Sequence, residues 1–280
     1  MQPNPRFIPT IDRLTALAAV GFAFFFLVAC SSETEETNDD TPKGPPLTVT
    51  VQNTFNGTPF SIGDTLTVED KYMVVVEDFR YLLSDAKAFD ANGKAVPLSS
   101  PGMIFDLKNG SELNWAAGSA PAGDYTGLSF LVGLPNKVNH QNVTDLADDH
   151  PLHDPDMHWS WNPDAGYKFL VLEGQVAALE DGTPGAFEKL AYHIATDATA
   201  QPVERLAGGM QFNVTETGGQ AYIRLDVAPL LTGRNLLQEN HTESMGKEQI
   251  ALAVKLSEKF KGMFSRGSAG SPTASAETPR

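Results

Sequence analysis

The segment Leu47-Thr-Val-Thr-Val-Gln52 alternates apolar and polar side chains, the period-two pattern of a β-strand with one buried face. Similar segments follow it, with turn residues at Gly63-Asp64 and Asn92-Gly93. The further predicted strands are 65–68, 71–76, 79–83, 124–134, 167–179, 190–196, 210–217 and 220–227. Strands at this spacing, separated by Gly, Pro, Asn and Asp, predict an all-β protein built as a single β-sandwich with long loops.

One segment near the C-terminus departs from the period-two pattern. Residues 244–264 place apolar side chains at helical spacing and leave charged residues for the other face. The apolar set is Ile250, Val254, Leu256, Phe260, Met263 and Phe264. We therefore expect a C-terminal amphipathic helix packed on the sandwich.

The N-terminal segment is typical of an export signal. Arg6 and Arg13 give it a basic start, and the apolar stretch 14–28 is too short for a comfortable transmembrane helix. Leu27-Val-Ala-Cys30 then matches the bacterial lipoprotein cleavage box, in which the cysteine is lipidated. The sequence predicts a signal peptide over 1–29 and a lipid on Cys30, with an uncleaved anchor or a simple secretory signal as alternatives.

The rest of the chain divides into three predicted parts. The lipidated Cys30 and an acidic, disordered linker occupy 30–46, one sandwich domain occupies 47–265, and a disordered tail occupies 266–280. This organisation predicts an outer membrane lipoprotein of a bacterium, facing the periplasm or the cell surface. The acidic cluster behind Cys30 resembles the surface-export signals of Bacteroidetes-type lipoproteins.

Charge and cysteine content exclude several classes of function. The chain has 20 Lys and Arg against 35 Asp and Glu, a net charge of −15, which argues against nucleic-acid binding and against adhesion to anionic lipid. Contact with the membrane is therefore expected through the lipid anchor only. Cys30 is the only cysteine, so its lipidation leaves no thiol for a disulfide, a metal or a nucleophile.

The most distinctive chemistry lies in residues 139–174. This segment holds four of the six histidines, His140, His150, His153 and His158, beside Met157, Trp159 and Trp161. Neutral imidazole suits copper and zinc, and thioether sulfur also suits Cu(I). If residues 157–161 are extended, Met157 and both tryptophans share one side and His158 points away.

Two other features bear on a metal site. His193 lies on a predicted strand, and a rigid strand holds a ligand well. Five aspartates in the histidine-rich segment make Ca²⁺ an alternative, although their spacing fits no EF-hand: Asp145, Asp148, Asp149, Asp154 and Asp156.

Signatures of catalysis are missing from the sequence. It has no GxSxG elbow, HExxH helix, phosphate-binding glycine loop or CxxCH haem site. We therefore expect a protein that is not an enzyme.

A set of ordered motifs resembles the MbnP-like family, the methanobactin-associated and related copper-binding proteins of the bacterial cell envelope. The resemblance runs from about Leu47 to Phe264. The motifs are Phe55-Asn-Gly-Thr-Pro-Phe60, Phe79-Arg-Tyr-Leu-Leu-Ser-Asp-Ala86, Pro121-Ala-Gly-Asp-Tyr-Thr-Gly-Leu-Ser-Phe130, Asn139-His140, His150-Pro-Leu152, Met157-His-Trp-Ser-Trp161, Gly166-Tyr-Lys-Phe-Leu-Val-Leu-Glu-Gly174 and Tyr192-His-Ile194.

The resemblance implies a β-rich protein that binds copper for acquisition, storage or delivery. In relatives, histidines and a tryptophan oxidised to kynurenine form the site, and a dihaem partner of the cytochrome c peroxidase/MauG type performs the oxidation. Carried over motif by motif, the resemblance gives the metal ligands His150 and His193, then His140, then His158. Trp159 and Trp161 become oxidised or pocket aromatics.

This chain departs from the family pattern in its first strand. Copper-binding relatives tend to have a histidine just before the FNG-like turn, where this chain has Asn53, and this chain has no tryptophan in that strand. Given this departure, we expect Trp159 and Trp161 to be structural aromatics. Loss of copper would leave the alternative function, a non-metal surface module. In that case Trp115, Trp159 and Trp161 would contact a protein or glycan partner.

Overall fold

A computed structural model describes residues 44–162, 165–206, 210–243 and 247–269. Contacts along the chain divide it into two units, Met1–Asp39 and Asp40–Arg280, and every described residue belongs to the second. The expected signal peptide, the lipidated Cys30 and most of the linker and tail lie outside the described residues. Within the described residues, no helix is both long enough and apolar enough to cross a membrane.

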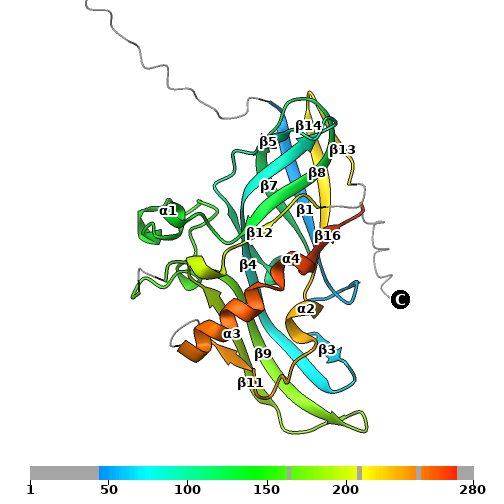
Figure 1. Ribbon diagram of the computed structural model, residues 1–280, viewed down its shortest axis with the longest axis vertical. Coiled ribbons are helices and arrows are strands. Elements are labelled where there is room, and N and C mark those ends of the chain that lie inside the picture. Colours follow the sequence, from blue (N-terminus) through cyan, green and yellow to red (C-terminus); the bar gives the residue numbers. More distant parts are fainter. Residues whose placement is uncertain (1–43, 163–164, 207–209, 244–246, 270–280) are drawn as a thin grey trace, which may run out of the picture. The chain divides into compact units, whose positions relative to one another are not determined.

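Strands dominate the domain (Figure 1). In chain order they are β1 (Pro46–Phe55), β2 (Thr58–Pro59), β3 (Thr65–Val68), β4 (Tyr72–Asp90), β5 (Ala95–Pro97), β6 (Met103–Asp106), β7 (Glu112–Ser119), β8 (Gly123–Val132), β9 (Lys168–Glu180), β10 (Thr183–Pro184), β11 (Glu188–Ala195), β12 (Gln201–Val203), β13 (Phe212–Thr215), β14 (Gly218–Asp226), β15 (His241–Thr242) and β16 (Phe264–Arg266).

The helices are short and lie mainly in connections. They are α1 (Asn136–Asn139), α2 (Ala228–Leu231), α3 (Lys247–Ser257) and α4 (Phe260–Met263), with four single turns of 3-10 helix, η1 (Leu107–Asn109), η2 (Val143–Asp145), η3 (Pro155–Met157) and η4 (Asp197–Thr199). The connection from β8 to β9 contains α1, η2 and η3, and it carries the four histidines of the distinctive segment.

The long strand β4 joins two groups of strands into one sheet (Figure 1). Residues 72–81 pair with β9, which continues to β11 and β15, whereas residues 83–90 pair with β8, which continues to β13, β14 and β1. All of these pairings are antiparallel except β1 with β14 and β11 with β15. The prediction of an all-β, sandwich-like fold is confirmed.

Some local predictions were wrong. The two strands expected over 71–76 and 79–83 form the single strand β4, because a bulge between Val76 and Asp78 lets the pairing with β9 continue. The C-terminal helix is divided into α3 and α4, and Ile250, expected on the buried face, is 40% exposed. Ala253 occupies the buried face in its place.

Two hydrophobic clusters lie on opposite faces of β4 and β9. Inward residues such as Tyr81 and Leu172 belong to the main core, where Tyr81 stacks on Phe105 with ring centroids 4.8 Å apart. Outward residues Leu82 and Val171 belong to a second cluster. Its other buried members are Leu134, Val143, Leu152, Met157, Tyr167 and Phe169. Most of these come from the β8–β9 connection, so this loop buries apolar side chains of its own against the sheet.

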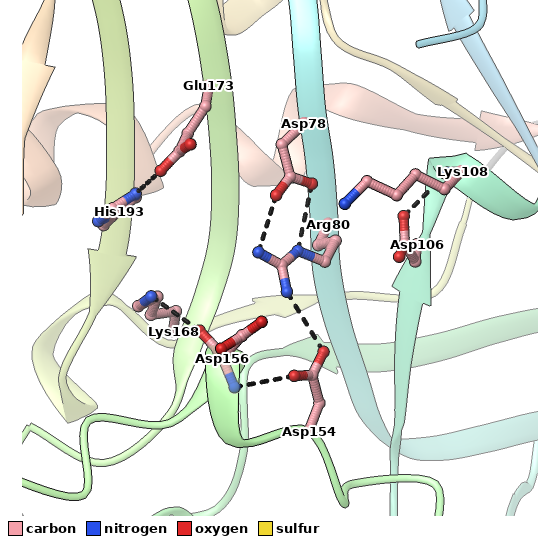
Figure 2. A network of polar contacts seen from close by, with 9 residues as sticks. All are labelled: Asp78, Arg80, Asp106, Lys108, Asp154, Asp156, Lys168, Glu173 and His193. Atoms are coloured by element: carbon pink, nitrogen blue, oxygen red, sulfur yellow. Dashed lines mark hydrogen bonds and ion pairs between the residues drawn. The ribbon is translucent and has the colours of Figure 1, made fainter.

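A half-buried arginine fastens this loop to the sheet. Arg80 on β4 donates two hydrogen bonds to Asp78, from Nε to Oδ1 at 3.2 Å and from Nη2 to Oδ2 at 2.8 Å. Its Nη1 donates to Asp154 Oδ2 at 3.3 Å, and the other Asp154 oxygen accepts from the backbone N–H of Asp156 at the start of η3 (Figure 2). One guanidinium therefore holds both a strand carboxylate and a loop carboxylate.

We expect Arg80→Met to lower the free energy of unfolding by about 3 kcal/mol, because the Asp78 carboxylate, only 12% exposed, would lose its counter-charge. Lys87→Met is the matched control. Lys87 pairs with Asp85 in an exposed position, so its removal should cost no more than about 0.5 kcal/mol. Urea denaturation of both variants measures the difference, and equal losses would contradict a structural role for the Arg80 pair.

Candidate metal centre

His158 is buried immediately after η3. Only 7% of it is exposed, its backbone bridges to Tyr167, and its ring meets the Tyr167 ring edge-on at 4.7 Å between centroids. Its Nδ1 lies 3.2 Å from the Ser160 hydroxyl. Its Nε2 is buried and makes no hydrogen bond within the part of the chain that the structure describes.

The His158 ring is held neutral by its surroundings. Burial lowers its pKa, and the charge that His140 can carry lowers the pKa further. A neutral imidazole with a buried, unsatisfied nitrogen is costly unless something binds that nitrogen. This geometry suits a metal ligand.

His140 follows α1 and is oriented by a carboxylate that the sequence analysis did not single out. Its Nε2 lies 3.0 Å from Oδ2 of Asp197, the first residue of η4. Asp197 also accepts hydrogen bonds from the side-chain amides of Asn136 and Asn139. Burial would raise the pKa of Asp197, but the hydrogen bonds from His140 and the two asparagines lower it overall.

His193 projects from β11 on the same face as Arg80. Its register partner on β9 is Val171, which in turn pairs with Arg80, and its Nε2 lies 2.5 Å from Glu173 Oε1 (Figure 2). Burial lowers the pKa of His193 despite the opposing effect of Glu173. This histidine therefore lies with Glu173 and Arg80 in a group of polar side chains on one face of β11, β9 and β4.

The two remaining histidines of the loop have other neighbours. His150 accepts a hydrogen bond at Nδ1 from the backbone N–H of Leu152 at 3.1 Å, which fixes a local turn. His153 places Nδ1 3.6 Å from the fully exposed carboxylate of Asp148.

The candidate ligands do not all converge. Across the described ranges, no three His, Cys, Asp or Glu side chains gather at metal-binding spacing. The aspartates considered as calcium ligands make different contacts. For example, Asp145 accepts a hydrogen bond from the Asn142 side chain, whereas Asp154 accepts one from Arg80. The charge that His140 can carry lowers the pKa of His158, and the ligand roles of all four histidines, His140, His150, His158 and His193, stay predictions.

The tryptophans occupy very different environments. Met157 ends a turn of 3-10 helix, so residues 157–161 are not one extended strand and the condition for His158 to point away is not met. His158 is buried instead. Trp159 is 6% exposed and packs with Ala195, while Trp161 is 67% exposed with its ring centroid 6.0 Å from that of Trp159. Lys168 Nζ lies over the Trp159 ring, 5.9 Å from its centroid. The same ammonium group donates a hydrogen bond to the Asp156 carbonyl oxygen (Figure 2).

Asn53, the residue that departs from the family pattern, is fully buried on β1. Its side-chain amide donates to the Ser111 carbonyl at 3.1 Å. Its Oδ1 and the nearby Tyr81 hydroxyl both lack a hydrogen bond of good geometry among the described residues. Asn53 thus faces the main core, whereas the His158 ring contacts Tyr167 of the second cluster.

Together these features define an all-β domain with a histidine-bearing loop packed on the outer face of its sheet. The model of the MbnP family matches residues 44–248, so the chain belongs to the MbnP family. Among solved structures, MbnP from Methylosinus trichosporium is similar, with 19% identity over 69% of this chain and 79% of that chain and a TM-score of 0.48. Comparison with curated proteins gives no match.

The burial of the tryptophans predicts a simple fluorescence result. Trp115, Trp159 and Trp161 are 1%, 6% and 67% exposed, so acrylamide should quench mainly Trp161. Trp161→Phe should remove the quenchable part of the emission, and Trp159→Phe should leave it in place. Quenching that survives in Trp161→Phe would contradict the burial of the other two.

The Glu173–His193 pair predicts how stability depends on pH. Burial would raise the pKa of Glu173, but the hydrogen bond and charge of His193 lower it overall, so the pair stabilises the fold above the ordinary carboxyl range. The pKa of His193 is also lowered in the folded protein. As the pH falls below about 6.5, His193 is therefore protonated in the unfolded chain before it is protonated in the folded protein.

Both effects make the free energy of unfolding fall on acidification from about pH 7 to about pH 4. Glu173→Gln removes the carboxylate that opposes the lowering of the His193 pKa, so this variant should show a larger fall over this range in urea denaturation. Glu180→Gln, at the exposed end of β9, should behave like the wild type. A Glu173→Gln curve parallel to that of the wild type would contradict the role assigned to the pair.

Proposed function

We propose that this protein binds copper in the bacterial cell envelope, for acquisition, storage or delivery, without catalysing a reaction. Membership of the MbnP family supports a copper-associated role. The Cys30 box supports a lipid anchor on the outer membrane, with the domain facing the periplasm or the cell surface. A dihaem partner of the peroxidase type belongs to the same proposal and comes from the family resemblance.

The observation that carries the proposal is the buried Nε2 of His158. This nitrogen has no hydrogen-bond partner among the described residues, and burial keeps the imidazole in the neutral form that a metal requires. The Ser160 hydroxyl oxygen can accept a hydrogen bond from Nδ1–H of His158, and in that tautomer the lone pair is on Nε2. A neutral imidazole nitrogen of this kind is a donor that copper accepts.

His140 is the second ligand in this proposal. It is the histidine whose charge reaches His158, and Asp197 holds its Nε2 in the way that a carboxylate orients a metal-binding imidazole. His150 and His193 rank behind this pair, because His150 Nδ1 accepts from Leu152 and His193 Nε2 is held by Glu173.

The exposure of Trp161 favours a second candidate function, a surface module that binds a protein or glycan. A tryptophan that is 67% exposed, beside the buried Trp159, offers a large contact area at small entropic cost. This candidate requires no metal, and in it His158 is a structural residue.

Competitive titration of the purified protein with Cu(I) and Cu(II) separates the two candidates. We expect His158→Ala and His140→Ala each to weaken copper binding at least about tenfold. Trp161→Ala should leave the copper affinity unchanged. His150→Ala and His193→Ala are matched controls from the same set of histidines.

Protons compete with copper for imidazole, so the affinity should fall on acidification below about pH 6.5. The lowered pKa of His158 shifts its part of this fall to more acidic pH. If the wild-type protein binds no copper, the result would favour the second candidate function, the surface module that binds a protein or glycan. Binding lost only in His150→Ala and His193→Ala would move the site to those residues.

A further inference from the structure

A cavity lies where β13 begins beside β8 (Figure 1). Its volume is about 490 Å³, and its lining residues come from three segments, Ala91, 124–126 and 211–213. Ala91 directly follows β4, 124–126 belong to β8, and 211–213 include the start of β13. Sites for small molecules in proteins typically have volumes of about 300–1,000 Å³, so this cavity is large enough to hold a small ligand.

Two aromatic residues in the lining are held in a fixed arrangement. Tyr125 and Phe212 are register partners on β8 and β13, and their rings stack with centroids 5.3 Å apart and planes inclined by 11°. Tyr125 is 3% exposed, and its hydroxyl donates to the Pro121 carbonyl oxygen at 2.8 Å. Phe212 is half-buried. This pair gives the cavity a rigid apolar component.

The polar side chains of the lining are oriented before any ligand binds. Asn213 and Asp124 are the next register partners, and Asn213 Nδ2 donates to Asp124 Oδ1 at 2.8 Å and to the Gly123 carbonyl oxygen at 3.2 Å. Within the described residues, Asp124 Oδ2, Asn213 Oδ1 and the exposed Gln211 amide make no hydrogen bond. Two fixed acceptors and one free amide therefore remain for a ligand, at a small cost in entropy.

The charge of the lining disfavours an anionic ligand. Asp124 is the one charged residue among the described residues that line the cavity. Arg205 lies beside the lining residue Thr126, but its Nη2 donates to the Thr126 hydroxyl at 2.7 Å and its guanidinium lies over the Phe89 ring at 5.2 Å. This cation is therefore held by protein groups, and a single carboxylate is too few for a hard metal ion.

The backbone at the cavity offers no edge for an extended peptide. Tyr125 pairs with Phe212 on one side and with Asp90 on the other, so β8 already has a neighbour on each side at this point. A peptide that adds a strand to the sheet needs a free edge. Recognition must therefore come from the side chains, and it suits an uncharged ligand with several hydroxyl groups and an apolar face.

We propose that this cavity binds a neutral saccharide unit. The hydroxyl groups of the sugar donate to Asp124 Oδ2 and Asn213 Oδ1 and exchange hydrogen bonds with the Gln211 amide, and its C–H face packs on the apolar lining. This site is separate from the residues of the proposed copper site, so it stands or falls without that function.

Saturation-transfer NMR titrations of the purified protein with maltotriose, cellotriose and chitotriose test the proposal. At least one of the three should bind, with a dissociation constant in the millimolar range. Asp124→Asn keeps the size of the side chain but removes the charged acceptor, and Gln211→Ala removes the free amide. Each variant should weaken binding at least about threefold, the effect of one lost hydrogen bond.

Glu112→Gln is the matched control. Glu112 is also an exposed carboxylate that accepts from an amide on the neighbouring strand, Gln52 Nε2 at 2.8 Å, but it does not line the cavity. This variant should bind the saccharide as the wild type does. Thermal unfolding of each variant identifies a loss of the fold, and Gln211→Ala decides the test if Asp124→Asn does not fold.

Three results would overturn the proposal. The first is that none of the trisaccharides binds, including the case in which choline or inorganic phosphate, titrated as charged probes, binds instead. The second is saccharide binding that Gln211→Ala and Asp124→Asn leave unchanged. The third is binding that is lost in Trp161→Ala but kept in both cavity variants, which would place the saccharide at the exposed tryptophan.

Discussion

The arrangement of this domain depends on the three hydrogen bonds that Arg80 makes to two aspartates. Its planar guanidinium grips Asp78 on its own strand with two nitrogens and reaches Asp154 of the β8–β9 loop with the third. Without that loop, the outer face of β4 and β9 would expose Leu82 and Val171 to water. The loop covers these side chains with its own apolar residues, and Arg80 fixes its position because a buried charge has few alternative partners.

The second hydrophobic cluster explains how a polar, proline-rich loop can hold functional groups in place. Met157 and Tyr167 are completely buried on either side of the His158–Trp161 turn, so the turn is supported at both ends. The His158 ring is thereby brought against Tyr167, in the vicinity of His140. A loop supported in this way holds the His158 ring in a fixed position, whereas the Trp161 side chain stays exposed to solvent.

Parts of this architecture were accessible from the sequence, and the reasons differ from element to element. The strands around Leu47, Asp124 and Leu190 were predicted because period-two alternation reflects one buried face. The continuity of β4 was missed because a bulge interrupts that period at Val76. Helical periodicity predicted the segment of α3 and α4, but the exposure of Ile250 depends on which parts of β11 and η4 the helix contacts.

Local sequence thus determined the fold class, the C-terminal helical segment and the family, because each depends on the order and periodicity of neighbouring residues. The tertiary structure alone decided which groups each histidine contacts. His140 and His158 are 18 positions apart in the sequence, and Asp197, which orients the first, follows a different strand. The contact between His140 and Asp197 depends on how the loop and the segment after β11 pack together, and no local pattern encodes a packing contact of that kind.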